Sequence, residues 1–79
     1  MARFFFHLNE RGKVTQDDEG RELADRSAAY KAAIVDARSI MAADLLGGSI
    51  CLGSHIDIMT SEGERVQKVS FKNAVIIDA

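Results

Sequence analysis

The stretch that decides the fold covers residues 26–46 and reads RSAAYKAAIVDARSIMAADLL. Its apolar side chains recur every three or four residues, which predicts one long amphipathic helix of roughly 30 Å. The residues on this apolar face are Tyr30, Ala33, Ile34, Ala37, Ile40, Met41 and Leu45. Asp25 or Ser27 can cap the first turn, because a side-chain oxygen there accepts from free backbone N–H groups. Gly47 follows the last turn, where helices commonly end on glycine.

Short segments with the two-residue alternation of β-strands lie on both sides of this helix. Residues 3–8 are the first, with Phe5 and His7 on one face. The opposite face of the same strand carries Phe4, Phe6 and Leu8. Residues 13–16 follow as a short second strand. After the helix, residues 56–59 and 66–71 predict a hairpin around a polar loop.

The predicted order is therefore β-β-α-β-β. One amphipathic helix must bury its apolar face against a sheet, which gives a two-layer α+β domain. We expect a three- or four-stranded antiparallel sheet. At 79 residues, the chain is expected to be a single domain over residues 1–79.

The order of several short motifs resembles a family of small bacterial proteins, the domain of unknown function 6894 family. The motifs are the aromatic opening at residues 3–8, Asp17-Asp18-Glu19-Gly20, the alanine-rich helix, Ile56-Asp57-Ile58, Glu62-Gly63 and Val69-Ser70-Phe71. The resemblance covers nearly the whole chain. It implies a bacterial, cytoplasmic setting, and it implies no activity, cofactor or catalytic residue.

Charge and composition argue against two classes of partner. The formal charge of −2 has the wrong sign for a dedicated nucleic-acid binder. Lys68 and Lys72, with Arg65 nearby, form only a small basic stripe, and Phe5 is the one aromatic residue that could stack a base beside it. Neither a signal peptide nor a membrane span is expected, so we predict a cytoplasmic protein without a membrane partner.

No set of residues predicts catalysis, a metal or a cofactor. In a calcium loop centred on Gly20, Arg26 would take the place of the twelfth-position glutamate, so residues 17–20 are expected to form a solvated turn. Cys51 is the only cysteine, which excludes an internal disulfide, and with His55 it supplies too few ligands for zinc. With Asp57 the same pair has the residue types of a nucleophilic triad, but no sequence signature surrounds it.

The strongest functional expectation is self-association. One helix covers one sheet face, which leaves Phe5 and His7 on the other. The helix is longer than the strands, so Leu45 and Leu46 should overhang. The apolar run at residues 74–77 adds two further candidate interface residues, Val75 and Ile77. A homodimer would bury these side chains. Alternatively, the C-terminal run folds back over the sheet and closes the monomer.

These observations predict a small, non-enzymatic, self-associating protein-interaction module, whose further protein partner the sequence does not identify. Two alternatives come from other classes. One is a nucleic-acid-linked regulator, by loose analogy with small antitoxins. The other is a small-ligand or metal site at a dimer seam.

Overall fold

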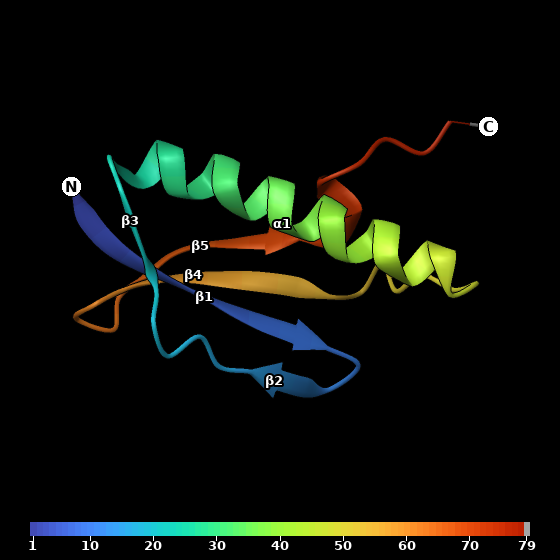
Figure 1. Ribbon diagram of the computed structural model, residues 1–79, viewed down its shortest axis with the longest axis horizontal. Helices are drawn as coiled ribbons and strands as arrows, with labels where there is room; N and C mark the ends of the chain where they lie inside the picture. Colours follow the sequence, from blue (N-terminus) through green and yellow to red (C-terminus); the bar gives the residue numbers. More distant parts are fainter. Residues whose placement is uncertain (79) are drawn as a thin grey trace.

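One helix lies across one face of an antiparallel sheet in the computed structural model, which describes residues 1–78 (Figure 1). The elements in chain order are β1 (Ala2–Glu10), β2 (Lys13–Thr15), β3 (Arg21–Leu23), α1 (Arg26–Leu46), β4 (His55–Thr60), β5 (Arg65–Ser70) and the 3₁₀ turn η1 (Phe71–Asn73). The two-layer α+β class is confirmed. The predicted strand order is incomplete, because three strands rather than two precede the helix.

The sheet has five strands, whereas three or four were predicted. Its order is β2-β1-β4-β5, and β3 also pairs with β1. The outer edge of β1 is thus shared: β2 pairs with Leu8–Glu10, and β3 pairs with Ala2–Phe4. β3 is not among the strands predicted from the sequence, because three residues are too few for a two-residue alternation to be recognised.

Small side chains hold α1 close to the sheet. Ala29, Ala33, Ala37 and Met41 are buried and recur every four residues, so they form one ridge along the helix. The ridge packs against a core from β1, β4, β5 and η1, namely Phe4, Phe6, Ile56, Ile58, Val69 and Phe71. The helix cap is Asp25, whose Oδ1 accepts from the Ala28 backbone N–H at 2.8 Å.

Tyr30, which the periodicity placed on the buried helix face, is 37% exposed because it lies at the margin of the face that meets the sheet. Leu45, in the last turn of α1, is 57% exposed. Leu46 is 92% exposed, and Figure 1 shows the last turns of α1 extending past the strands. The predicted overhang of the helix is therefore present.

The C-terminal apolar run does not form a strand. β5 ends at Ser70, and Phe71 turns into the core while its backbone N–H donates to the Ser54 carbonyl at 2.9 Å. The chain then leaves the sheet, with Ile76 89% and Ile77 70% exposed. The alternative in which this run covers the sheet and closes the monomer is therefore wrong. None of the helices within residues 1–78 is long and apolar enough to cross a lipid bilayer.

Candidate functional site

A carboxylate takes the place of a strand partner at the edge of β1. Between β2 and β3, the chain bulges away from β1 at residues 16–20. In this gap the Asp17 carboxylate accepts from the backbone N–H of Phe6 at 3.0 Å. It also accepts from the N–H groups of Glu19 at 3.2 Å and Gly20 at 3.0 Å. The Asp17 N–H in turn donates to Nδ1 of His7 at 3.0 Å, so the turn is fixed to β1 at two points.

Only glycine fits at the end of this turn. Gly20 has φ +71°, in the left-handed region, and a Cβ there would lie 2.8 Å from the carbonyl oxygen of Phe4. The same Cβ would lie 3.0 Å from the ring of Phe5. The turn is therefore pressed against the backbone of β1, and this contact sets the start of β3.

The charge of Asp17 is stabilised by its surroundings. Burial by itself tends to raise the pKa of this carboxyl group, but three backbone N–H donors and the nearby guanidinium of Arg21 outweigh it. The pKa of Asp17 is consequently below its ordinary value. Asp18 and Glu19 are exposed, as expected for a solvated turn, but the Asp17 carboxylate also anchors the turn to β1. The spacing of an aspartate three residues before a glycine is a recognised turn pattern and could have indicated it.

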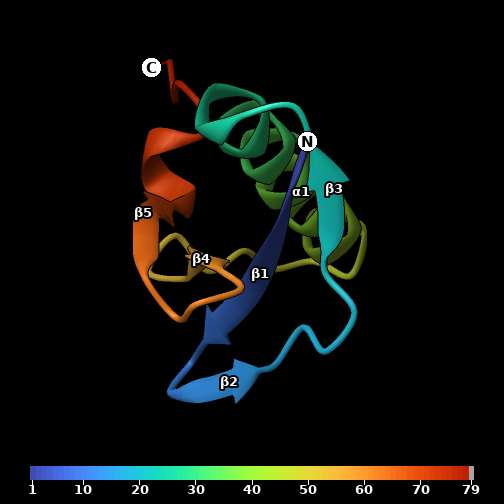
Figure 2. The same ribbon diagram turned by 90° about the vertical axis from the view of Figure 1, so that its left-hand side faces the viewer.

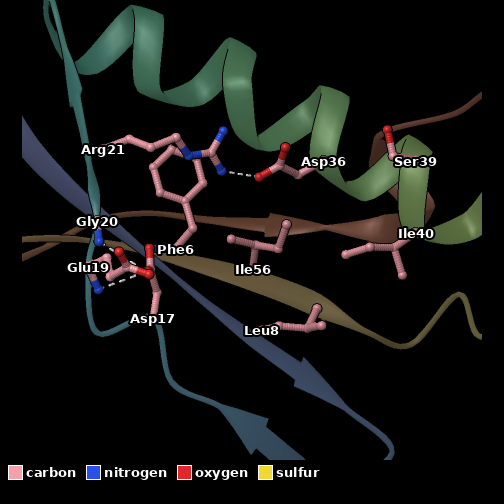
Figure 3. A pocket seen from close by; sticks show the side chains of 10 residues that line it. All are labelled: Phe6, Leu8, Asp17, Glu19, Gly20, Arg21, Asp36, Ser39, Ile40 and Ile56. Atoms are coloured by element: carbon pink, nitrogen blue, oxygen red, sulfur yellow. Dashed lines mark hydrogen bonds and ion pairs between the residues drawn. The ribbon is translucent and has the colours of Figure 1, made fainter.

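A pocket of about 520 Å³ opens beside this turn, between α1 and the β1–β3 edge (Figure 3). Arg21 reaches across it from β3: its guanidinium lies 4.2 Å from the centre of the Phe6 ring and pairs with Asp36 on α1. The pocket is lined by Phe6, Leu8, Asp17, Glu19, Gly20, Arg21, Asp36, Ser39, Ile40 and Ile56. Its volume lies within the usual range for small-molecule sites.

The pocket combines an apolar floor with an acidic rim. Three lining residues carry carboxylates, Asp17, Glu19 and Asp36, against the single guanidinium of Arg21. This balance suits an organic cation with an apolar body. A metal centre is not indicated, since no group of three or more potential His, Cys, Asp or Glu ligands occurs within the described residues.

A second groove, of about 370 Å³, follows the opposite flank of α1. Figure 2 shows α1 between β3 on one side and η1 on the other, and this groove is on the η1 side. It is lined by Tyr30, Lys31, Ile34, Val35, Arg38 and Asn73. Unlike the first pocket, its charged residues are basic. We call it the helix-flank groove.

The sheet face that α1 leaves uncovered is largely polar. Phe5 and His7 are both half-buried and stack on each other with ring centres 6.5 Å apart. Asp57 lies opposite His7 on β4, pairs with Arg65 at 3.1 Å and lies 3.4 Å from His55. Arg65 is thus neutralised within the sheet. Lys72 lies in η1 rather than on β5, so the expected basic stripe is shorter than the sequence implied.

The six expected interface residues do not form one surface. Phe5 and His7 alternate along β1 with the buried Phe4 and Phe6, so they lie on the sheet face opposite α1. The other four lie at the end of α1, Leu45 and Leu46, and after η1, Val75 and Ile77. Val75 is half-buried and packs against the core, whereas Ile77 is exposed. One flat interface cannot contain both sets.

Cys51 does not join His55 and Asp57 in one cluster. His55 faces Asp57 on β4, whereas the Cys51 thiol lies in the loop before that strand. The Ser54 hydroxyl and the Gly53 backbone N–H lower the pKa of the thiol. The Ser54 side chain is buried, and its oxygen has no hydrogen bond of standard geometry within residues 1–78.

Comparison with known families assigns the chain. A family model described as Domain of unknown function (DUF6894) matches residues 3–72. The chain belongs to the DUF6894 family. The match runs from β1 into η1, so it includes the Asp17 turn, the pocket and α1, and it ends before Val75. The family resemblance deduced from the sequence is confirmed. No curated protein and no solved structure matches the chain significantly.

Proposed function

We propose that this DUF6894 domain is a small, non-enzymatic module of the bacterial cytoplasm that forms a homodimer and, as such, binds another protein. The observation that carries the proposal is the exposure of large apolar side chains on and beside α1. Val35 is 58%, Leu46 92% and Ile76 89% exposed. A domain this small needs most of its large apolar side chains for its own core. The exposure of several such side chains on and beside one helix therefore favours a protein interface.

Exposure is concentrated on the helix layer of the fold. Beyond those three, Tyr30, Leu45 and Ile77 are exposed on α1 or in the segment after η1. By contrast, the apolar residues of the uncovered sheet face, Phe5 and Met59, are half-buried among polar neighbours. The helix layer therefore offers the better apolar surface for a second copy.

Size-exclusion chromatography with light scattering tests the proposal at several protein concentrations. We expect a mass of about twice 8.6 kDa that falls towards 8.6 kDa on dilution. A monodisperse species of 8.6 kDa at every concentration would contradict it.

A second candidate function is the binding of a small organic cation in the pocket beside the Asp17 turn. Its support is the acidic rim over an apolar floor, where the carboxylates of Asp17, Glu19 and Asp36 outnumber the single guanidinium of Arg21. An amine with an aromatic body would place its ring on the floor and its charge among the carboxylates.

A pair of compounds with similar shape and opposite charge tests this candidate. In a ¹H–¹⁵N NMR titration, phenethylamine should shift the amide signals of Phe6, Gly20 and Ile40, whereas hydrocinnamate should not. Asp36→Asn should weaken the response to the amine. Equal responses to both compounds, or no response to either, would contradict a site selective for cations.

A further inference from the structure

We propose that the segment Ile76–Asp78 of one copy lies in the helix-flank groove of a second copy, and that the exchange is reciprocal. The inference rests on the proposed homodimer and locates its interface. The groove is the one lined by Tyr30, Ile34 and Val35 between the cations Lys31 and Arg38.

The chemistry of the segment matches that of the groove. Ile76 and Ile77 are 89% and 70% exposed, so two adjacent apolar side chains have no cover within their own chain. Asp78 follows them directly and supplies a carboxylate. In the groove, an apolar strip carries basic side chains at its border, so apolar burial and charge attraction act together.

The other pocket is a poor alternative for this segment. It also has an apolar floor, but its rim holds the carboxylates of Asp17, Glu19 and Asp36. Asp78 would be repelled there, because like charges placed close together are unfavourable. The charge of Asp78 therefore favours the helix-flank groove over the pocket on the other flank of α1.

The segment starts beside the groove. Ala74 is 1% exposed, and its carbonyl oxygen accepts from Nε of Arg38 at 2.7 Å. Asn73, the residue before it, lines the groove itself. The root of the segment is thus fixed against the middle of α1. Val75 also packs against the core of its own chain, so only the residues from Ile76 onward are free to reach a partner.

The direction of the segment favours exchange over binding within one chain. From η1 it runs towards the C-terminal end of α1, whereas its own Tyr30 and Val35 lie towards the N-terminal end (Figure 1). To enter its own groove, the chain would have to reverse at Val75. A twofold axis near η1, perpendicular to α1, places the partner helix antiparallel. The partner's groove then lies ahead of the segment, and the same twofold rotation places each copy's segment in the groove of the other.

The experiment compares dimer dissociation constants by analytical ultracentrifugation of the full chain and four single variants. Ile77→Asp and Val35→Asp change the segment and the groove respectively, and each should weaken the dimer at least about tenfold. Val14→Asp is a matched control at an exposed apolar position on β2, and it should change the constant by less than about threefold. Leu46→Asp tests the competing surface at the end of α1, and if the exchange forms the dimer it should also change the constant by less than about threefold. Circular dichroism checks that each variant is folded.

Charge reversal supplies a second, independent readout. Lys31→Glu should weaken the dimer, and adding Asp78→Lys to that variant should restore part of the affinity. A monomeric unmodified chain would overturn the proposed function and this inference together. A dimer that Ile77→Asp and Val35→Asp leave intact, or that only Leu46→Asp disrupts, would overturn the exchange and leave self-association standing.

Discussion

Replacing Gly20 by alanine should be among the most damaging small substitutions in this domain. Two separate costs act there. At φ +71°, an alanine is in the left-handed region, which costs about 1–2 kcal/mol. Its Cβ would also lie 2.8 Å from the Phe4 carbonyl oxygen, which is backbone and cannot rotate away. The turn must then shift, and the hydrogen bond from the Gly20 N–H to Asp17 would lengthen or break.

The magnitude follows from these terms. Losing one hydrogen bond to a charged group costs about 1.5–3 kcal/mol, and alanine regains about 0.4–1 kcal/mol by restricting the unfolded chain. We therefore expect a net loss of about 2–4 kcal/mol for Gly20→Ala. The whole domain is expected to have a stability of only about 4–12 kcal/mol, so this loss would be a large fraction of it.

Alanine substitutions at three other glycines distinguish the cost of the positive φ from the cost of the close contact with β1. Gly12 (φ +79°) and Gly63 (φ +85°) have positive φ, but a Cβ at either position would meet no atom within 4 Å, so alanine there bears only the backbone cost. Gly53 has neither feature, and alanine there should be neutral or slightly stabilising. Urea unfolding followed by circular dichroism gives the free energy of unfolding for all four variants. If Gly20→Ala and Gly12→Ala lose the same stability within about 0.5 kcal/mol, the close contact with β1 does not exist.

Three further outcomes are expected. The pKa of Asp17 is lowered in the folded state, so its charge contributes stability above the unfolded-state pKa, and this stability is lost as the pH falls through the folded-state pKa. In urea unfolding near pH 7, Asp17→Asn should therefore be less stable than the unmodified chain by about 1–3 kcal/mol. Below about pH 5, the free energy of unfolding of this variant should change less with pH than that of the unmodified chain. Ala37→Leu should cost about 1–3 kcal/mol in the same assay, because Ala37 is fully buried against the sheet; an unchanged midpoint would contradict the close approach of α1. Gel-shift assays with DNA and RNA at low salt should show no complex, and a clear shift would revive the nucleic-acid alternative.

The helix and its caps could be predicted because their signals are local. Residues 26–46 contain a full helical periodicity, and Asp25 immediately precedes it, so the boundaries of α1 follow from neighbouring residues alone. The expected burial of Tyr30 was wrong for a different reason. It depends on how wide the sheet is and where it ends, and periodicity does not contain that information.

Most of the candidate site could not be predicted from the sequence. β3 is recognised as a strand only through its pairing with β1, which depends on the Asp17 turn between them. Arg21 and Asp36 are fifteen residues apart and meet only because β3 and α1 flank the same pocket. The path of the C-terminal run was equally hidden, because it depends on Phe71, which enters the core after β5 and turns the chain out of the sheet.

An isotope-filtered NOE experiment on a mixture of ¹³C-labelled and unlabelled chains tests the reciprocal exchange most directly. Only contacts between two copies give signals in such a sample. We predict NOEs from the methyl groups of Ile76 and Ile77 in one copy to the ring of Tyr30 and the methyl groups of Val35 in the other. Intermolecular NOEs confined to Leu46 or to the sheet face around Phe5, or no intermolecular NOEs at a concentration where dimer is expected, would contradict it.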